Sequence, residues 1–474
     1  MHQAESSKVR AAGVQRRSHR TALTLGLAVL TVAAITAALL PGLGHDAWSW
    51  MIWAREIAHL ELDTTTGSTI KPLPMLLMAP LGPVGELAPF TWLALSRAAW
   101  LAVPVFAWQI GDRLGGRRAA AFAAAGALLV PVLFDASVNG YSEPLTALAL
   151  LGAILALLSN RPTPALALIT AAGLMRPEAW AFSLAIGVWG IHSGRVRPAT
   201  AIALFVAPIA VWAGLSWWGS GEPFGGASGT ESIRAAGGVL LPFFNGIAPL
   251  AAVGLAAAVV LAVRDRNRSV LMLLGASAAW VVLVAVLIQI GFSGNARYLV
   301  PAEVVGSVAA GWGLARACEL LERTRLRQAA TGAVAVGFGA SLLFGLSFAA
   351  DSISRFRSGS ETAAAMKAAV NLAGGRDAIV GVGEPIVMNW SRRTALAWQL
   401  EVPITGTQVI WGPNWTGSLE LPAILLASPS REGNRRAPLP TNIALESIGR
   451  SGEWSVYRAA RAGVSTARAR SAAR

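Results

Sequence analysis

Eleven charged residues in this sequence stand beside long apolar runs, and their types suit chemistry on a phosphate and a hydroxyl group. The acidic members are Asp46, Glu56, Asp135, Glu143, Glu178, Glu222 and Glu303, and the basic members are Lys71, Arg176, Arg234 and Arg297. A carboxylate can take the proton of an attacking hydroxyl, and Lys and Arg side chains bind phosphate. If the apolar runs pack together with these residues at one end, the set predicts a cavity that receives both groups.

Asp46 is the leading candidate for a catalytic residue, because it follows the first apolar run closely, six residues past Leu40. Its carboxylate could activate an acceptor hydroxyl or hold a divalent cation. The alternative is that Asp46 caps the N-terminus of a helix that begins at Ala47, and the two roles are compatible. His45 could add a ligand, although one His–Asp pair does not define a site.

Lys71 and Glu143 are candidates for binding a phosphate or orienting a substrate, and each has a structural alternative. Lys71 could bind phosphate as a point charge, or it could lie at the membrane interface with its ammonium group in water. Glu143 precedes Pro144, so it could simply start a helix at the positive end of the helix dipole.

Two arginines have the same ambiguity. Arg176 stands in a short Arg-Pro-Glu turn that ends at Glu178, and its guanidinium could bind a phosphate with two donors. Pro177 also explains a helix start at this point. Arg297 and Tyr298 enter a late apolar run in a similar way. Arg176, Glu178, Arg297 and Tyr298 are predicted to take part in substrate or phosphate binding. His45 is predicted to do the same.

The elements that must position these residues are membrane spans. Hydrophobic residues make up 54% of the 474 positions and charged residues only 14%, whereas soluble domains carry roughly 25% charged residues. Runs such as Thr21–Leu40 and Val270–Ile290 have the roughly 20 residues needed to cross a bilayer. We predict eleven spans, at 21–40, 88–110, 119–134, 144–159, 163–175, 178–192, 198–218, 242–263, 270–291, 298–315 and 329–349.

The distribution of Lys and Arg predicts the orientation. With the N-terminus inside, the inner segments carry 18 of these residues and the short outer loops carry five. An odd number of spans then leaves the chain after about residue 350 outside the membrane. The net charge of +14 does not indicate nucleic-acid binding, because the positive charges punctuate the apolar runs. The single cysteine, Cys318, excludes an internal disulfide.

The predicted domains are a cytoplasmic basic N-terminus (1–20), a transmembrane domain (21–350), an extracytoplasmic α/β domain (351–458) and a disordered basic tail (459–474). The first outer segment contains His45–Glu56, which we interpret as an interfacial helix with Trp48, Trp50 and Trp53 at the headgroups. Gly219–Leu240 is predicted to be a flexible loop. In the α/β domain we predict an amphipathic helix and three strands, at Ser360–Ala373, Ala378–Val382, Ala423–Ala427 and Trp454–Tyr457.

Four of these features resemble GT-C type glycosyltransferases, which are multi-span enzymes that use polyprenyl-phosphate sugars outside the bacterial membrane. Asp46 follows the first span in a long outer loop, and Asn139–Pro144 forms a second loop. Leu174–Ala179 is similar to the Arg-Pro turn common in these families. A late span begins at Ala296–Pro301, and a soluble outer domain follows the last span. The resemblance implies the GT-C fold and a location in the bacterial plasma membrane.

The resemblance also implies a mechanism, an inverting displacement in which Asp46 activates the acceptor hydroxyl. The lipid phosphate would leave, stabilised by Lys71, Arg176 or Arg297. The implied partners are a polyprenyl-phosphate-linked sugar donor, membrane lipid, and a glycan, lipid or protein acceptor. Many relatives carry two adjacent acidic residues in the first loop, whereas Asp46 is flanked by His45 and Ala47. That departure weakens the prediction of a bound divalent cation.

Two other functions are compatible with a multi-span chain. A transporter or lipid flippase would place charges near the middle of the bilayer and interrupt spans in corresponding halves, whereas the charges here are biased to one edge. A non-catalytic scaffold of cell-envelope assembly would be indifferent to the substitution Asp46→Asn, which an enzyme would not tolerate.

Overall fold

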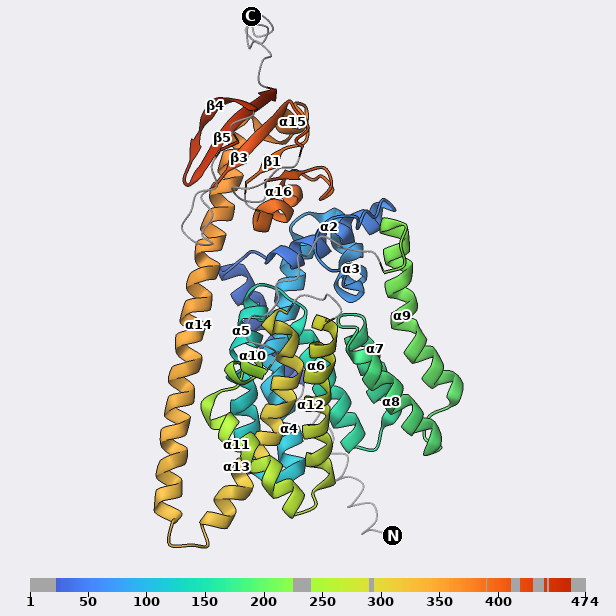
Figure 1. The fold of residues 1–474 in the computed structure, drawn as a ribbon, viewed down its shortest axis with the longest axis vertical. Coiled ribbons are helices and arrows are strands. Elements are labelled where there is room, and N and C mark those ends of the chain that lie inside the picture. The colour runs from blue at the N-terminus through green and yellow to red at the C-terminus, as the bar shows by residue number, and fades with distance from the viewer. Residues whose placement is uncertain are drawn as a thin grey trace, which may run out of the picture. The chain divides into compact units, whose positions relative to one another are not determined.

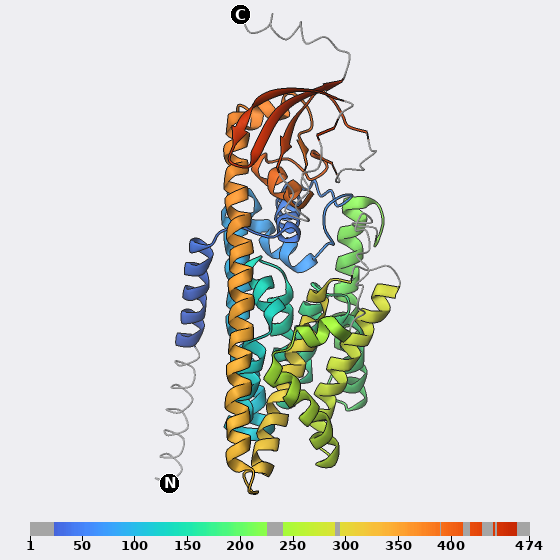
Figure 2. The same cartoon turned by 60° about the vertical axis from the view of Figure 1, so that its left-hand side comes forward.

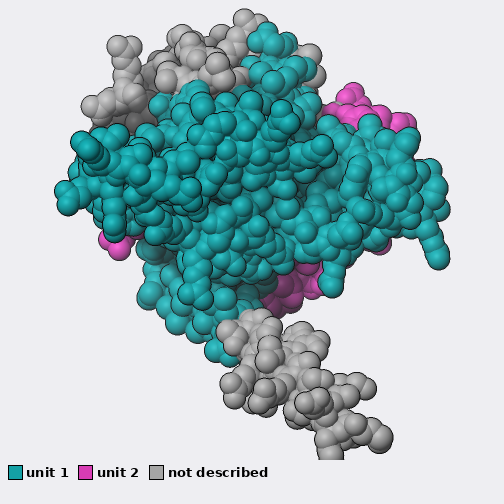
Figure 3. Space-filling view, turned by 90° about the horizontal axis from the view of Figure 1, so that it is seen from below, with its two compact units in different colours: residues 1–41, 90–205, 232–350 teal, residues 42–89, 206–231, 351–474 magenta. Residues whose placement is uncertain are grey.

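A computed structural model of the chain describes residues 23–224, 240–289, 294–388, 390–410, 418–428, 439–440 and 443–461. Outside the described residues lie the N-terminal basic segment 1–20, Arg234, most of the predicted loop Gly219–Leu240 and the tail beyond residue 461. The chain divides into two compact units. Unit 1 comprises residues 1–41, 90–205 and 232–350, and unit 2 comprises 42–89, 206–231 and 351–474 (Figure 3).

Unit 1 is built from helices (Figure 1). Many of them begin with proline in the first turn, where the missing N–H costs nothing. The helices, some of which continue into unit 2, are the first helix at Leu23–Leu39, α4 (Leu87–Leu128), α5 (Pro131–Val138), α6 (Glu143–Leu158), α7 (Pro162–Gly173), α8 (Ala179–His192), α9 (Pro198–Ser220), α10 (Leu240–Asn245), α11 (Pro249–Arg264), α12 (Arg268–Gln289), the 3-10 helix η2 (Ala296–Leu299), α13 (Val300–Leu321) and α14 (Arg327–Leu372).

The central helix of unit 1 is α13, in which every residue from Val300 to Ala315 is buried. Small residues let its neighbours approach closely. A Cβ on Gly313 would collide with the backbone of α11, and a Cβ on Gly311 would collide with the backbone of α4. Close contact at small residues is how helices associate in a membrane, where there is little hydrophobic drive between them. By contrast, α14 exposes large apolar side chains such as Leu343 and Leu346.

Five helical segments are long and apolar enough to cross a membrane: α4, α9, α12, η2 with α13, and α14. Five shorter apolar segments accompany them among the described residues. The helices predicted at 88–110 and 119–134 are both present, separated within α4 by non-helical residues, but the second ends at Leu128 instead of 134. α4 continues to Leu128 with a break at Gly115 and Gly116, the latter at a φ of 71°, and α5 is a separate short helix. The prediction that 329–349 and Ser360–Ala373 are separate helices is wrong, because α14 runs through both (Figure 2). The residues between the two predicted helices are more polar, but they do not interrupt the helix.

Unit 2 contains α2 (His45–His59), α3 (Pro72–Met78), the 3-10 helix η1 (Ala79–Val84) and a five-stranded sheet. The strand order is β2-β1-β3-β5-β4, with β1 parallel to β2 and β3, and β5 antiparallel to β3 and β4. The strands and the two helices of this domain are β1 (Ile386–Val387), β2 (Gln408–Val409), β3 (Ala423–Ala427), β4 (Ile443–Ser451), β5 (Trp454–Arg461), α15 (Gly375–Val380) and α16 (Arg393–Gln399).

Two of the three predicted strands are confirmed and one is wrong. Ala423–Ala427 is β3, and Trp454–Tyr457 begins β5. The third run, Ala378–Val382, forms the end of helix α15 and a turn. A run of five apolar residues does not distinguish a strand from a helix segment. Here Gly374 and Gly375 adopt φ values of 97° and 83°, which turn the chain after α14 into a second helix.

Candidate functional site

In unit 1 the structure brings together four of the predicted site residues, namely Glu143, Arg176, Glu178 and Arg297. Glu143 is the first residue of α6, which Pro144 helps to start. Arg176 and Glu178 lie in the short turn between α7 and α8, where the Arg176 N–H donates to the Ala172 carbonyl at 2.8 Å. Arg297 lies in η2, which leads into α13. Three separate helix ends therefore deliver the cluster.

The Glu143 carboxylate is the centre of this cluster. Arg176 donates a hydrogen bond to Glu143 Oε1 through Nη2. Arg297 Nε lies 3.8 Å from the same oxygen, and Arg176 Nη1 lies 3.8 Å from Glu178 Oε1. The Glu143 and Arg176 side chains are only 1% and 2% exposed, whereas Arg297 is 16% exposed. Burial at this level requires charge pairing, and the two carboxylates balance the two guanidinium groups.

Two tyrosines stack on these arginines. The Arg176 guanidinium lies 4.2 Å from the centre of the Tyr298 ring, and that of Arg297 lies 4.4 Å from the centre of the Tyr141 ring. Both distances are well within cation–π range. Tyr298 was predicted as a site residue. Tyr141 was not, although it lies in the Asn139–Pro144 motif and could have been found there.

A set of donors on α4 fixes the loop that carries Tyr141 and Glu143, and sequence reasoning did not find it. Trp92 Nε1 donates to the Gly140 carbonyl at 2.7 Å, and Ser96 Oγ donates to the Tyr141 carbonyl at 2.9 Å. Arg97 Nη2 donates to the Val138 carbonyl at 3.3 Å. The signal was available, because Arg97 is a charge inside a predicted span.

Arg97 also joins the first helix to this loop. Its guanidinium donates to the carbonyl of Thr36, and Nη2 donates to the carbonyl of Leu40 at 2.8 Å. These carbonyls lie at the C-terminal end of the helix Leu23–Leu39, and Val138 ends α5. A cation at two helix C-termini satisfies carbonyls that lack partners within their helices and complements the negative ends of both dipoles.

The other predicted site residues, His45, Asp46 and Lys71, belong to unit 2. Helix α2 begins at His45 with Gly44 as its N-cap residue, so Asp46 lies inside the first turn and the N-cap interpretation is wrong. Asp46 and His45 are both partly exposed. Lys71 is the N-cap residue of α3 and is only 7% exposed. A lysine that kept its ammonium group in water would be more exposed, so this burial argues against the interfacial alternative.

Two of the three tryptophans of α2, Trp50 and Trp53, are internal, whereas Trp48 is partly exposed. Trp50 and Trp53 are 1% and 0% exposed, so the interpretation that they lie at the headgroups is wrong. Trp50 Nε1 donates to the Thr69 carbonyl at 3.1 Å, and Trp53 Nε1 donates to the Asp63 carbonyl at 2.8 Å. These bonds tie α2 to the loop that leads to Lys71.

Glu56 lies on the same helix and accepts a hydrogen bond from the Asp63 N–H at 3.0 Å. Burial raises the pKa of the Glu56 carboxyl to about 7. Asp63 differs. Burial opposes its ionisation, but hydrogen bonds from Thr65 and Thr405 outweigh that effect and lower the pKa of the Asp63 carboxyl. The pKa values of the Glu56 and Asp63 carboxyls are therefore shifted in opposite directions.

The remaining charged residues that sequence reasoning placed at the outer edge are dispersed. Glu222 is exposed, and Asp135 in α5 accepts a hydrogen bond from Asn139. Glu303 is fully buried in α13, where its carboxylate packs against Gly246. Among the described residues, no group of three or more His, Cys, Asp and Glu side chains could hold a metal ion.

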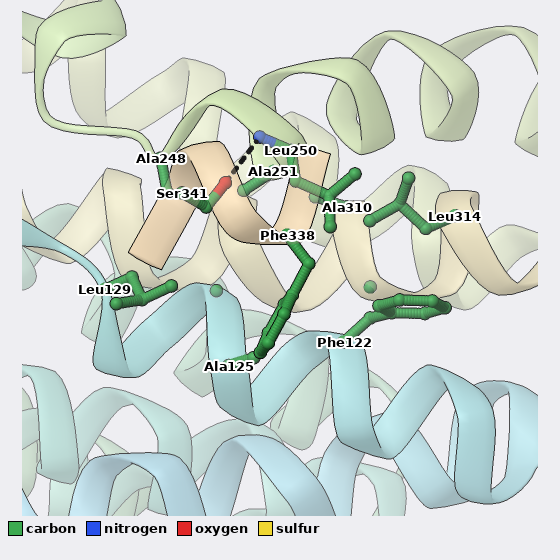
Figure 4. Close-up of a pocket in the computed structure, with 12 residues that line it drawn as sticks. Phe122, Ala125, Leu129, Ala248, Leu250, Ala251, Ala310, Leu314, Phe338 and Ser341 are labelled. Carbon is green, nitrogen blue, oxygen red and sulfur yellow. Dashed lines mark hydrogen bonds between the residues drawn. The ribbon is translucent and has the colours of Figure 1, made fainter. Parts of the chain in front are cut away.

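A narrow pocket in unit 1 is apolar and contains none of the predicted site residues (Figure 4). It lies between α4, α11, α13 and α14, and Phe122, Leu129 and Phe338 contribute to its wall. Its one polar contact is the hydrogen bond from the Leu250 N–H to Ser341 Oγ at 3.0 Å. Its chemistry suits hydrocarbon rather than a charged group.

No protein-family model matches this sequence, and no curated protein matches it. The fold is similar to that of ArnT from Cupriavidus metallidurans, solved in the apo state and bound to undecaprenyl phosphate. In the bound structure the TM-score is 0.61 at 15% identity, covering 93% of this chain and 98% of ArnT. The apo structure matches with the same TM-score at 16% identity.

A second similar structure is the Archaeoglobus fulgidus oligosaccharyltransferase tethered to an acceptor peptide containing the NVT sequon. Its TM-score is 0.52 at 11% identity, covering 82% of this chain and 64% of the other. These likenesses show that the chain has an ArnT-like fold. The fold that the sequence resemblance implied is therefore confirmed.

Proposed function

We propose that this protein is a membrane glycosyltransferase that moves a sugar from a polyprenyl-phosphate donor to an extracytoplasmic acceptor. The observation that carries the proposal is the fold, which matches ArnT bound to undecaprenyl phosphate over 93% of the chain. The buried cluster around Glu143 supports it, because two arginines and two tyrosines meet at the ends of three helices. The acceptor is a glycan, a lipid or a protein, and nucleic acid has no part.

The proposed reaction is a displacement with inversion at the anomeric carbon. Asp46 takes the proton of the acceptor hydroxyl, whose oxygen attacks that carbon while the bond to the phosphate oxygen breaks. The departing lipid phosphate keeps the electron pair and needs positive charge rather than an acid. Arg297 is the best placed arginine of its unit to contact the phosphate, because Arg176 is buried on Glu143 and Glu178. Lys71 and His45 are proposed to take part in substrate binding.

Glu143 and Glu178 have a different proposed role from Asp46. Each lies beside a buried arginine, so they hold the guanidinium groups in place and balance their charge. Tyr298 supports the Arg176 guanidinium from the face of its ring. We propose that these three residues orient the phosphate-binding groups and do not exchange protons with the substrate.

The next question is whether the protein's residues fit a bound divalent cation. A structure of the Archaeoglobus fulgidus oligosaccharyltransferase contains Zn and sulfate, with a TM-score of 0.50 to this chain. The described residues of this chain provide no cluster of three metal ligands, and Asp46 alone is an incomplete site. The residues therefore do not fit a resident metal ion, and no step of the proposed reaction passes through one.

The proposed location is the bacterial plasma membrane, with the N-terminus cytoplasmic and the C-terminus extracytoplasmic. The excess of Lys and Arg in the predicted inner segments supports this orientation. The proposed domains are the N-terminal segment 1–20, the transmembrane domain 21–350 and the C-terminal domain that begins at 351. The predicted boundary at 458 falls within β5, which ends at Arg461.

The test is turnover by the purified protein in liposomes, with polyprenyl-phosphate sugars as donors and cell-envelope extracts as acceptors. Asp46→Asn is expected to lower turnover by about 10²–10⁴-fold, the usual contribution of a general base. Thermal stability and donor binding should be unchanged. Asp112→Asn is the matched control, because Asp112 is exposed on α4 at the predicted inner side. Unchanged turnover in Asp46→Asn, or donor movement without sugar transfer, would contradict the proposal and favour a scaffold or a flippase.

A further inference from the structure

The first outer segment and the C-terminal domain belong to the same compact unit, although more than 260 residues separate them in the chain. The contact is made by α16, which packs against α2 (Figure 1). Trp398 of α16 packs against Trp48 of α2, with 5.6 Å between ring centres and 35° between the ring planes. The Arg55 guanidinium lies 5.1 Å from the centre of the Trp398 ring. α2 therefore has a partner of its own on the C-terminal domain.

Thr394, the second residue of α16, contacts His45 directly. Its side chain is completely buried. Thr394 Oγ1 lies 3.2 Å from the His45 carbonyl oxygen and 3.1 Å from His45 Nδ1. The hydroxyl has one proton, and a carbonyl can only accept, so the proton points to the carbonyl. Nδ1 must then carry its own proton and donate to Oγ1. One side chain thus fixes both the backbone and the ring of His45.

Arg393, the residue before, holds the loop that leads to Lys71. Its Nη1 donates to Thr66 Oγ1 at 2.9 Å. The same guanidinium donates to Thr407 Oγ1 at 3.1 Å and to the Thr407 carbonyl, so it is anchored within the C-terminal domain. The planar guanidinium holds these three acceptors in fixed directions. Arg393 therefore couples the position of Thr66 to that of α16.

Further contacts make the same connection. Thr405 Oγ1 donates to Asp63 Oδ2 at 2.8 Å, and Arg55 Nη2 donates to the Val402 carbonyl at 2.9 Å. Gly67 has a φ of 124°, and a Cβ there would lie 2.9 Å from Ile404 Cδ1. Residues 393–407 therefore contact the outer segment at several points, from His45 at its start to the loop that leads to Lys71.

We propose that the segment 393–407 is a positioning element of the transferase site, and that Thr394 and Arg393 are its principal positioning residues. Thr394 orients His45 and, through the backbone, the adjacent Asp46. Arg393 sets the loop that ends at Lys71. The C-terminal domain thus shapes the catalytic segment and is not merely a separate module that captures acceptor. The catalytic part of this inference rests on the proposed glycosyltransferase function.

The experiment compares Thr394→Val with Thr394→Ser and with a matched control, Thr362→Val. Thr362 is also a buried threonine of unit 2, but its hydroxyl bonds Ser358 and Glu453, away from the outer segment. Hydrogen exchange of residues 42–60 is measured by mass spectrometry in the full-length protein. Thr394→Val should raise exchange at the start of α2, whereas Thr394→Ser and Thr362→Val should leave it near the wild-type level.

Turnover is the second readout. Thr394→Val is expected to lower kcat by about tenfold or more, because small displacements of catalytic groups have large effects. The donor KM should change less than twofold, and Thr394→Ser should restore kcat. If Thr394→Val does not fold, Arg393→Gln provides the same test at the loop before Lys71. Equal exchange and equal kcat in Thr394→Val and Thr362→Val would overturn the proposal. Altered exchange in a protein without transferase activity would instead contradict only the proposed function.

Discussion

The two charged regions of this protein are held by different means. In unit 1, Glu143, Arg176 and Arg297 hold one another through ion pairs, and tyrosine rings cover them. In unit 2, α16 and the residues after it hold the segment around Asp46. The donors are uncharged groups and one arginine. The first arrangement is charge-balanced and buried, while Asp46 itself remains partly exposed.

The difference has a chemical consequence. A balanced, buried cluster keeps its geometry and is suited to a constant task, such as holding cations near a phosphate. A carboxylate that accepts a proton from a substrate, as proposed for Asp46, has to stay accessible, and here α16 acts on it through the backbone and through His45. Four predictions test this contrast, from the largest expected effect to the smallest.

Breaking the buried pair in unit 1 should have the largest effect on stability. Arg176→Ala leaves the Glu143 and Glu178 carboxylates without this charge partner, and breaking a buried pair costs about 3–5 kcal/mol of free energy of unfolding. Thermal unfolding in detergent measures it. Arg118→Ala is the control, because the Arg118–Glu322 pair has side chains 57% and 43% exposed and should change the midpoint little. Equal midpoints for the two variants would contradict the difference in burial.

Removing the more exposed arginine should affect binding more than stability. Arg297→Ala is expected to weaken binding of undecaprenyl phosphate by about 2 kcal/mol, or roughly thirtyfold, because a charged hydrogen bond to phosphate is lost. Calorimetry in detergent measures the Kd. Arg297→Lys should recover part of the affinity but not the geometry of a guanidinium. An unchanged Kd would remove Arg297 from the phosphate site.

The pH dependence of stability tests the burial of Glu56 in unit 2. Its carboxyl has a pKa of about 7 in the folded protein, against an ordinary value of 4.5. Between these values the folded state keeps a proton that the unfolded state has lost, so stability falls as pH rises from 4.5 through 7. Glu56→Gln should therefore raise the free energy of unfolding at pH 8 by on the order of 2 kcal/mol, and the unfolding midpoint should rise with it. At pH 4 the two proteins should match. If Glu56→Gln raised the free energy of unfolding equally at pH 4 and pH 8, that result would argue against a buried, ionisable Glu56 carboxyl.

The donors of α4 should give the smallest change. Ser96→Ala removes one hydrogen bond to the Tyr141 carbonyl and should cost about 1 kcal/mol of free energy of unfolding. It should also raise the donor KM, because the loop carries Tyr141 and Glu143. Ser137→Ala is the control, since the Ser137 hydroxyl donates to the carbonyl of Phe134 within its own helix. Identical donor KM values in the two variants would show that Ser96 does not position the loop.

Much of the site could be predicted from local patterns. Prolines and charges at helix starts located Glu143 and the Arg176–Glu178 turn, because the helix terminus is a local feature with a local signature. Arg297 and Tyr298 were located in the same way, because they stand at the start of a late apolar run. β3 and the start of β5 were found because short apolar runs bounded by polar residues are typical of strands.

Other features depended on pairing between distant segments. The burial of Trp50 and Trp53 could not be predicted, since an aromatic helix after a span has the same pattern in a core as at an interface. The contact between Thr394 and His45 joins positions 349 residues apart, and neither residue signals the other. The same holds for Ser96 and the Tyr141 carbonyl, because a backbone acceptor has no side-chain signature.

The sequence by itself determined that this chain is a membrane protein and which charges lie at helix ends, because hydropathy and capping act within a few residues. Only the tertiary structure decided how Glu143 shares two arginines, and that the C-terminal domain packs against the segment carrying Asp46. Those arrangements follow from the packing of whole helices and from hydrogen bonds to backbone carbonyls. Both are properties of the folded chain, and no local pattern records them.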